Sequence, residues 1–217
     1  MIKKHKWKLW ISSILILLPC LFGAIVWDRL PSQMATHWGA DGEANGWSGK
    51  LFAVLGLPLI LLALHWICLL ITMQDNRHTG QPQKAFGIVF WLLPVISLYM
   101  NGIIYAGALG VPLNMSALLF LLLGIGFTVI GNYLPKTKQN RTYGIKLPWT
   151  LANEENWNKT HRFAGRLWVI TGLLCFPAGF LPWKAFPVVF ILILLLAVLP
   201  PCLYSYILHK KQSKQDT

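Results

Sequence analysis

The sequence predicts an all-α membrane protein, a bundle of six transmembrane helices with both termini in the cytoplasm. Hydrophobic residues make up 55% of the 217 residues and charged residues only 12%, about half the share that soluble domains carry. Apolar runs long enough to cross a bilayer recur along the whole chain, and Lys and Arg gather in alternate connecting regions. These observations predict a multi-pass protein of the cell membrane with the lipid bilayer as its main partner.

A membrane helix needs about 20 mostly apolar residues. Six segments meet this requirement, namely residues 9–27, 51–73, 85–106, 115–133, 163–181 and 186–207. The fifth is the weakest, because Arg166 lies near its start and Pro177 near its end. The basic N-terminus and first apolar run resemble a signal peptide, but no clear small-residue cleavage site follows. We therefore expect a retained first helix.

The distribution of positive charge orients these spans. With the N-terminus inside, 16 of the 19 Lys and Arg residues fall on the cytoplasmic side, as the positive-inside rule requires. The formal charge of +12 is thereby explained by membrane insertion, and we expect no direct binding to nucleic acid. We expect two modules of three spans each: residues 1–113, with an outer loop at 28–50, and residues 114–217, with a cytoplasmic loop at 134–162.

The outer loop contains side chains that could bind a metal, His37, Asp41 and Glu43. The order of residues from Asp41 also imitates the first half of a calcium-binding loop, but the twelfth position, which needs a bidentate Glu, is Phe52. We therefore expect no metal site. The glycines favour turns and predict a compact turn-rich loop, with Trp38 and Trp47 against the membrane surface.

The same loop carries a short motif. It consists of Leu30-Pro31, Thr36-His37-Trp38-Gly39, Asp41-Gly42 and Gly46-Trp47. This order resembles a small N-terminal module of unknown function that recurs in Gram-positive membrane proteins. The resemblance implies a shared loop structure, with His37, Trp38, Gly39, Asp41 and Gly42 as its motif residues, and it supplies no chemistry.

Two polar residues lie inside predicted spans, His65 in the second and Asn101 in the third. Such groups are costly in a membrane and usually face the bundle interior. They indicate either a proton-linked or ligand-facing site, or a neutral histidine hydrogen-bonded to a neighbouring helix. No predicted span contains Asp or Glu, which argues against a proton-driven transporter.

The cytoplasmic loop predicts an amphipathic helix at the inner surface that continues into the fifth span. Thr150 and Asn153 are good N-cap residues, and Glu155 with Lys159 forms a favourable i,i+4 pair. Two faces follow from the helical spacing: Trp157, His161, Ala164 and Trp168 on one, and Glu155, Lys159, Arg162 and Arg166 on the other. This helix is either a structural brace or a surface that binds a partner.

This region carries a second and longer motif. It reads Gly131-Asn132-Tyr133-Leu134-Pro135, Asn140-Arg141-Thr142-x-Gly144-Ile145-Lys146-x-Pro148-Trp149-Thr150-Leu151, Trp157-x-Lys159-Thr160-His161-Arg162 and Gly165-Arg166. The pattern resembles the C-terminal signature of the SdpI family of bacterial immunity proteins, in which many members have arginine where Lys146 stands. The motif residues that we single out are Asn132, Arg141, Gly144, Lys146, Pro148, Trp149, Thr150, Trp157, Thr160, His161 and Arg162.

The resemblance implies resistance to a secreted, membrane-active toxin peptide. It also implies a possible relay of the toxin's presence by recruitment of a cytoplasmic transcriptional repressor. The alternative is a small-solute or lipid transporter, based on His65 and Asn101. We expect no enzyme and no cofactor, because neither polar loop contains an activated nucleophile or a recognised metal pattern.

Overall fold

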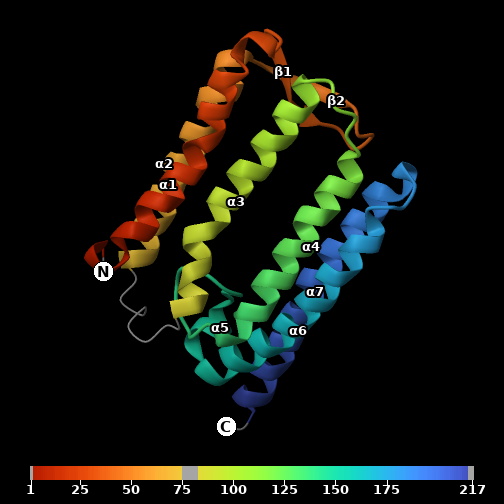
Figure 1. The fold of residues 1–217 in the computed structure, drawn as a ribbon. Helices are drawn as coiled ribbons and strands as arrows, with labels where there is room; N and C mark the ends of the chain where they lie inside the picture. The colour runs from red at the N-terminus through yellow and green to blue at the C-terminus, as the bar shows by residue number, and fades with distance from the viewer. Residues whose placement is uncertain (1, 75–82, 215–217) are drawn as a thin grey trace. The chain divides into compact units, whose positions relative to one another are not determined.

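The computed structural model describes residues 2–74 and 83–214, most of which are helical (Figure 1). The chain forms two compact units. Of the described residues, the first contains 2–74 and 87–115, and the second contains 83–86 and 116–214.

The first unit has three long helices and a hairpin. Its elements are α1 (Ile2–Ile25), a 3₁₀ turn (Trp27–Arg29), β1 (Gln33–Trp38), β2 (Ala44–Gly49), a π-helical turn (Phe52–Gly56), α2 (Leu57–Gln74) and α3 (Gln83–Ala108). Its hydrophobic core lies beside the hairpin and consists of Leu30, Met34, Ala53, Val54, Ile104 and Tyr105. The core thus holds the hairpin against the helix ends of this unit.

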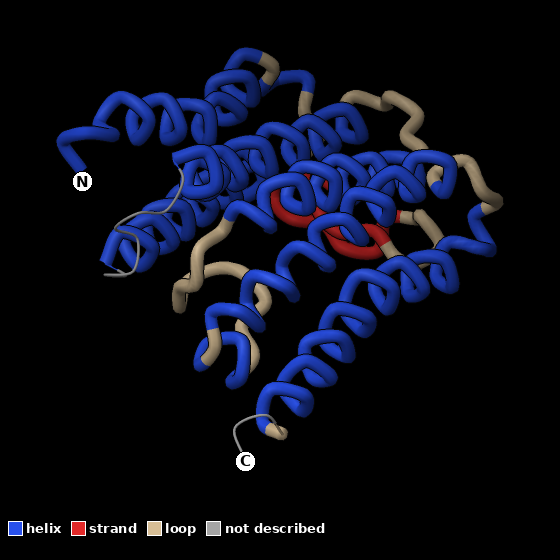
Figure 2. The backbone as a smooth tube through the Cα atoms, turned by 90° about the horizontal axis from the view of Figure 1, so that it is seen from below, coloured by secondary structure: helices blue, strands red, loops and turns tan. Residues whose placement is uncertain are grey.

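The outer loop corrects the all-α prediction. It is a β-hairpin rather than a turn-rich loop: β1 and β2 are antiparallel, with Gln33 opposite Gly49 and Trp38 opposite Ala44 (red in Figure 2). Met34 points into the core while its neighbours Gln33 and Ala35 are more exposed, as expected for a strand with one buried face. The sequence signal that we missed is the Asp-Gly pair at the turn, a strong hairpin indicator.

The second unit consists of helices that pack along one another. Its elements are α4 (Met115–Tyr133), a 3₁₀ turn (Leu134–Lys136), α5 (Pro148–Ala152), α6 (Glu154–Ala178), a 3₁₀ turn (Trp183–Ala185) and α7 (Phe186–Ser213). Glycines bring α4 and α6 together: a Cβ added to Gly131 would lie 2.8 Å from the Gly165 carbonyl oxygen, and one on Gly124 would lie 3.0 Å from that of Gly172. Small residues permit this close approach of membrane helices.

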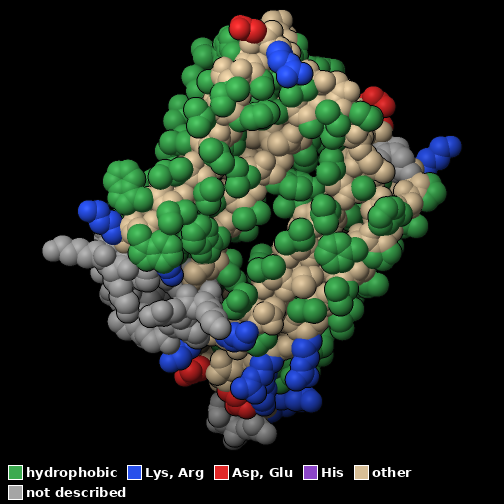
Figure 3. Space-filling view, in the orientation of Figure 1, with side chains coloured by type: hydrophobic (Ala, Val, Ile, Leu, Met, Phe, Trp, Pro, Cys, Tyr) green, Lys and Arg blue, Asp and Glu red, His purple; other side chains and the backbone are tan. Residues whose placement is uncertain are grey.

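Five helical segments of the described chain are long and apolar enough to cross a membrane. They are Lys6–Ile25, Phe52–Gln74, Gly87–Ala108, Met115–Lys136 and Phe186–Ser213. These five agree with five of the six expected spans and confirm a multi-pass membrane protein. The expected fifth span lies in α6, which is not among them because charged residues occupy its first half. Figure 3 shows hydrophobic side chains along the helix flanks and Lys and Arg gathered where α7 ends.

Candidate functional site

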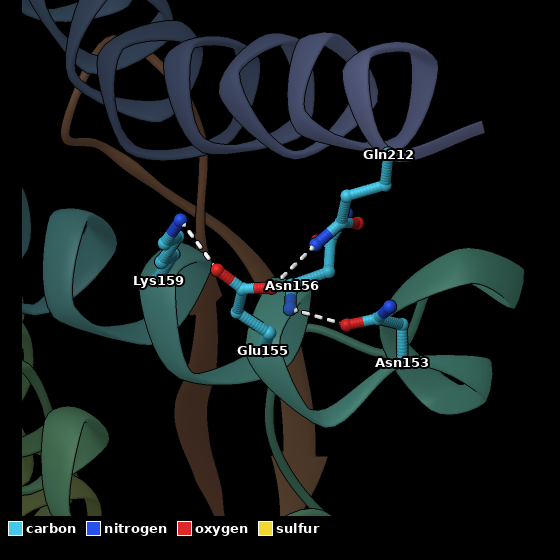
Figure 4. Close-up of polar contacts among 5 residues, drawn as sticks. All are labelled: Asn153, Glu155, Asn156, Lys159 and Gln212. Atoms are coloured by element: carbon cyan, nitrogen blue, oxygen red, sulfur yellow. Dashed lines mark hydrogen bonds and ion pairs between the residues drawn. The ribbon is translucent and has the colours of Figure 1, made fainter. Parts of the chain in front are cut away.

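Most of the long motif lies in residues 134–162, which follow α4 and include the start of α6; we call them the α4–α6 segment. Local hydrogen bonds determine where the helices of this segment begin. Leu147 is extended before Pro148, as a residue preceding proline should be. The Thr150 hydroxyl accepts from the Leu147 N–H (2.9 Å) and donates to the Ile145 carbonyl (2.8 Å). Asn153 then caps α6, because its side-chain oxygen accepts from the Asn156 N–H at 2.8 Å (Figure 4). The expected helix start near Asn153 is confirmed.

The exposed face of α6 carries the predicted ion pair. Lys159 Nζ lies 2.7 Å from Glu155 Oε1, and Gln212 of α7 donates to the other Glu155 oxygen at 3.3 Å (Figure 4). The hydrogen bond and charge of Lys159 lower the pKa of Glu155 below its usual value. Both groups are solvent-exposed, so the pair contributes little to stability.

The opposite face of α6 is buried within the protein. Trp157, His161 and Ala164 are fully buried, and the Trp168 indole N–H donates to the Ala197 carbonyl oxygen of α7 at 2.8 Å. The two predicted faces are therefore confirmed. The apolar face, however, packs on the chain's own loop and on α7, so this part of α6 braces the second unit instead of lying on lipid.

Trp157 and His161 fasten the loop to α6. The Trp157 indole N–H donates to the Thr137 carbonyl at 2.8 Å, and the two rings stack with centroids 3.9 Å apart. His161 Nδ1 lies 2.8 Å from the Trp157 carbonyl oxygen, while its Nε2 lies 3.0 Å from the Ile145 backbone nitrogen. A carbonyl only accepts and a backbone N–H only donates, so Nδ1 carries the proton and Nε2 accepts.

His161 is therefore neutral in the folded protein. Burial lowers its pKa to about 4, although the hydrogen bond to the Trp157 carbonyl acts in the opposite direction. A second proton on Nε2 would face the Ile145 N–H and break that contact. We call the contacts of Trp157 and His161 with the loop backbone the lock, because they hold the loop on α6. Within it, His161 has a structural role and no acid–base role at neutral pH.

Gly144 is the third member of this lock. Its φ of +117° lies in a region that L side chains rarely adopt. A Cβ at this position would also lie 2.6 Å from His161 Nε2 and 2.8 Å from the Trp157 ring. Only glycine fits, which explains why the motif has glycine here.

A buried polar cluster joins this region to α7. The Trp149 indole N–H donates to the Ser205 hydroxyl (2.8 Å), which donates to Asn156 Oδ1 (2.8 Å). Thr160 donates to the same oxygen at 3.0 Å, and Asn156 Nδ2 donates to the Ser205 carbonyl at 3.1 Å. We did not single out Asn156 or Ser205 from the sequence, although Asn156 falls beside the predicted buried face.

The loop itself is shaped by another residue absent from our predicted site, Asn140. Its side-chain oxygen accepts from the N–H groups of Thr142 and Tyr143, both at 2.9 Å, and its amide donates to the Lys138 carbonyl. One fully buried side chain thereby satisfies three backbone groups. An Asn at the start of a Gly-containing loop is the sequence signal for such a turn.

The outer motif has a different geometry. His37 Nδ1 lies 2.5 Å from Asn45 Oδ1 across the hairpin, at an exposed position. Gly39, Asp41 and Gly42 build the turn, with Gly42 at a φ of 75° and Asp41 accepting from the Glu43 N–H. In the described ranges, no group of three His, Cys, Asp or Glu side chains is arranged to hold a metal ion.

The hairpin tryptophans lie differently from one another. Trp38 packs on the core of the first unit, whereas Trp47 is 58% exposed. Only Trp47 is therefore free to contact a surrounding membrane surface in the way that we predicted for both.

The polar residues inside the spans are buried in the first unit. His65 Nε2 lies 2.8 Å from the Ser12 hydroxyl of α1, and Asn101 donates to the Ser97 carbonyl at 2.8 Å. His65 Nδ1 and Asn101 Oδ1 have no hydrogen-bond partner within the described chain. Both the interhelical hydrogen bond that we considered and a potential ligand-facing atom are thus present at His65.

Comparison with known proteins agrees with both motifs. Residues 136–205 match the SdpI/YfhL protein family, and residues 14–62 match a domain of unknown function, DUF1648. Over 205 aligned residues the chain is 25% identical to Immunity protein SdpI of Bacillus subtilis (strain 168). The aligned region covers 93% of this chain and 95% of that protein. We call residues 136–205, which match this family model, the SdpI-family region. No solved structure matches the chain.

The motif residues of the SdpI-family region and the helix before it fall into two sets. One set holds the fold: Thr150, Trp157, Thr160 and His161 are buried, Trp149 is half-buried beside Ser205, and the exposed Gly144 lies against His161 and Trp157. The exposed set consists of Asn132, Arg141, Lys146, Pro148 and Arg162. Lys146 donates to the Thr142 carbonyl at 3.1 Å, so it also closes the loop. The side chains with access to a partner are chiefly the cations Arg141, Lys146 and Arg162.

Proposed function

We propose that this chain is an integral membrane immunity protein that protects its cell from a secreted, membrane-active toxin peptide. The observation that carries the proposal is the similarity to Immunity protein SdpI along nearly the whole of both chains. The exposed hairpin and the helices of the first unit would meet the toxin. The second unit would report its presence inside the cell.

The topology that this function needs is six spans with both termini in the cytoplasm. The 16-to-3 division of Lys and Arg between the two sides supports this topology. The hydrogen bond from Trp168 of α6 to Ala197 of α7 also supports it, because it packs α6 against a helix that is apolar enough to cross the membrane. Cysteines introduced at Glu43 and Lys146 test the orientation. A membrane-impermeant thiol reagent added to whole cells labels the first and not the second; equal labelling of both contradicts the topology.

Toxin challenge tests immunity directly. A toxin-sensitive Bacillus strain without its own immunity gene survives when this chain is expressed, and an empty vector does not protect it. If survival is unchanged although the chain is found in the membrane fraction, the immunity proposal is wrong.

The relay part of the proposal rests on the exposed cations of the SdpI-family region. The double variant Arg141→Gln and Arg162→Gln removes charge that a cytoplasmic repressor would contact, and it leaves in place both the buried contacts of His161 and the loop-closing Lys146. We expect the variant to lose repressor recruitment to the membrane while it still protects the cell. Arg29→Gln with Lys184→Gln is the control, which keeps recruitment. Unchanged recruitment by the double variant contradicts the relay.

A second candidate function, transport of a small solute or lipid, is favoured by His65 Nδ1 and Asn101 Oδ1, which have no hydrogen-bond partner among the residues that the structure describes. Buried polar atoms without partners in a membrane helix mark positions where a substrate or proton binds. If this is the function, His65→Ala abolishes an uptake or efflux phenotype. An unchanged phenotype removes this candidate.

A further inference from the structure

The C-terminal end of α7 has a small cavity just beyond the SdpI-family region. The cavity holds about 180 Å³ and is lined by Tyr206, Ile207, Lys210, Lys211 and Lys214. Tyr206, Lys210 and Lys214 are four positions apart, as are Ile207 and Lys211, so the five residues share one face of α7. All five are exposed. Nothing in the proposed toxin or repressor contacts uses this face.

The position of the cavity along α7 matches the depth of lipid headgroups. The apolar run of the last candidate span ends near Ile207. At a rise of 1.5 Å per residue, Lys210 lies about 4.5 Å and Lys214 about 10 Å beyond it. The headgroup region extends roughly 5 to 8 Å outside the hydrocarbon core. Lys210 and Lys211 therefore lie at the level of lipid phosphates, and the long side chain of Lys214 can reach back towards that level.

Glu155, the carboxylate that contacts α7, is bound away from the cavity. Glu155 is held by Lys159 and by Gln212, and Gln212 lies about 200° around the helix from Lys210 and Lys214. Lys210 lies over the Tyr206 ring, 5.7 Å from its centroid. The cavity thus combines three cations with an aromatic and an aliphatic wall.

The helix end that carries the cavity is fixed in place. Trp149 of α5 packs edge-on against Tyr206 (5.7 Å between centroids), stacks on His209 (5.5 Å) and donates to Ser205. The buried cluster around Asn156 holds Ser205 in turn. Lysines on a fixed helix end bind an anion with a smaller ordering cost than lysines on a mobile tail would.

We propose that this cavity binds the headgroup of an anionic phospholipid. The phosphate accepts from Lys210, Lys211 and Lys214, and Ile207 with the Tyr206 ring contacts the glycerol and the start of the acyl chains. A lipid fits better than a soluble phosphate because the cavity continues an apolar membrane helix. The bound lipid anchors the end of α7, and through Trp149 and Ser205 it stabilises the SdpI-family region.

Lipid competition on the purified full-length protein tests the proposal. Native mass spectrometry of the protein in equal amounts of phosphatidylglycerol and phosphatidylcholine measures which lipid it retains. We expect wild type to retain the anionic lipid in preference, on the order of tenfold. The variant Lys210→Gln, Lys211→Gln and Lys214→Gln loses this preference. The control Lys6→Gln, Lys136→Gln and Lys138→Gln removes the same charge elsewhere and keeps it.

Two further measurements complete the test. The thermal unfolding of both triple variants in detergent shows that they remain folded, and the Lys210/Lys211/Lys214 variant loses the stabilisation that phosphatidylglycerol gives wild type. Millimolar inorganic phosphate does not displace the lipid if a headgroup with its glycerol is the ligand. Equal loss of preference in both triple variants, retained preference in the α7 variant, or displacement by phosphate would each overturn the proposal.

Discussion

The hairpin at residues 33–49 and the α4–α6 segment at residues 134–162 are both polar regions with Gly, Trp and His residues, yet they are built in opposite ways. The hairpin is held by backbone pairing between two strands, and its His37–Asn45 contact is exposed. The α4–α6 segment is held by side chains that bond to backbone, and Trp157, His161, Asn140 and Thr150 are all fully buried.

The difference shows what each motif encodes. In the hairpin, the glycines and Asp41 specify a turn and leave most side chains on the surface. In the α4–α6 segment, most motif residues specify the fold itself, and only a few exposed cations are available to a partner. Buried motif residues should therefore be sensitive to substitution through stability, and exposed ones through recognition. Four measurements sharpen or break this comparison.

The largest effect is expected at Trp157. Trp157→Ala leaves a large cavity and removes the donor to the Thr137 carbonyl, which destabilises the second unit by about 3 to 5 kcal/mol. The matched substitution in the hairpin is Trp47→Ala, which costs about 0.5 kcal/mol because the side chain is mostly exposed. Thermal unfolding of the purified variants measures both, and similar losses in the two variants would break the comparison.

Acid should weaken the α4–α6 segment through His161. Its folded pKa of about 4 lies below the ordinary value of 6.5, so the unfolded chain takes up the proton at a higher pH than the folded chain. The stabilisation is complete above about pH 6.5 and is lost as the pH falls towards 4, by up to about 3 kcal/mol.

Unfolding at pH 7.5 and at pH 4.5 measures this effect. Wild type loses more stability between the two pH values than His161→Gln, which has no titrating group at this position. An equal acid loss in both proteins would show that His161 is not the group responsible.

Replacing a positive-φ glycine by alanine in each region compares how much stability the two glycines contribute. Gly144→Ala adds backbone strain and a clash with His161 and Trp157, for a total of about 2 to 3 kcal/mol. Gly42→Ala in the hairpin turn adds backbone strain at a φ of 75°, about 1 kcal/mol. Denaturant unfolding ranks the two variants, and a larger loss for Gly42→Ala contradicts the proposed lock.

The smallest effect is expected in the hairpin. Asn45→Ala removes the exposed hydrogen bond to His37 and changes stability by about 0.5 kcal/mol or less. Hydrogen exchange of the hairpin amides reports whether the strands stay paired. Extensive loss of protection would show that this side chain holds the hairpin in the way that His161 holds the inner loop.

Much of the architecture follows from local sequence. The length of the apolar runs determined five spans, and the spacing of Trp157, His161 and Ala164 determined the buried face of α6. Asn153 and the residues after it determined where that helix begins. Each of these features depends on periodicity or capping within a few residues, which a single sequence displays directly.

Tertiary structure alone decided how the motif residues act. The contact of His161 with Ile145 and the hydrogen bonds between Asn156 and Ser205, 49 residues apart, join positions with no local signal between them. A histidine or asparagine on a helix face has the same spacing whether it binds a partner or its own loop. Only the buried donors and acceptors around it show that here it holds the fold.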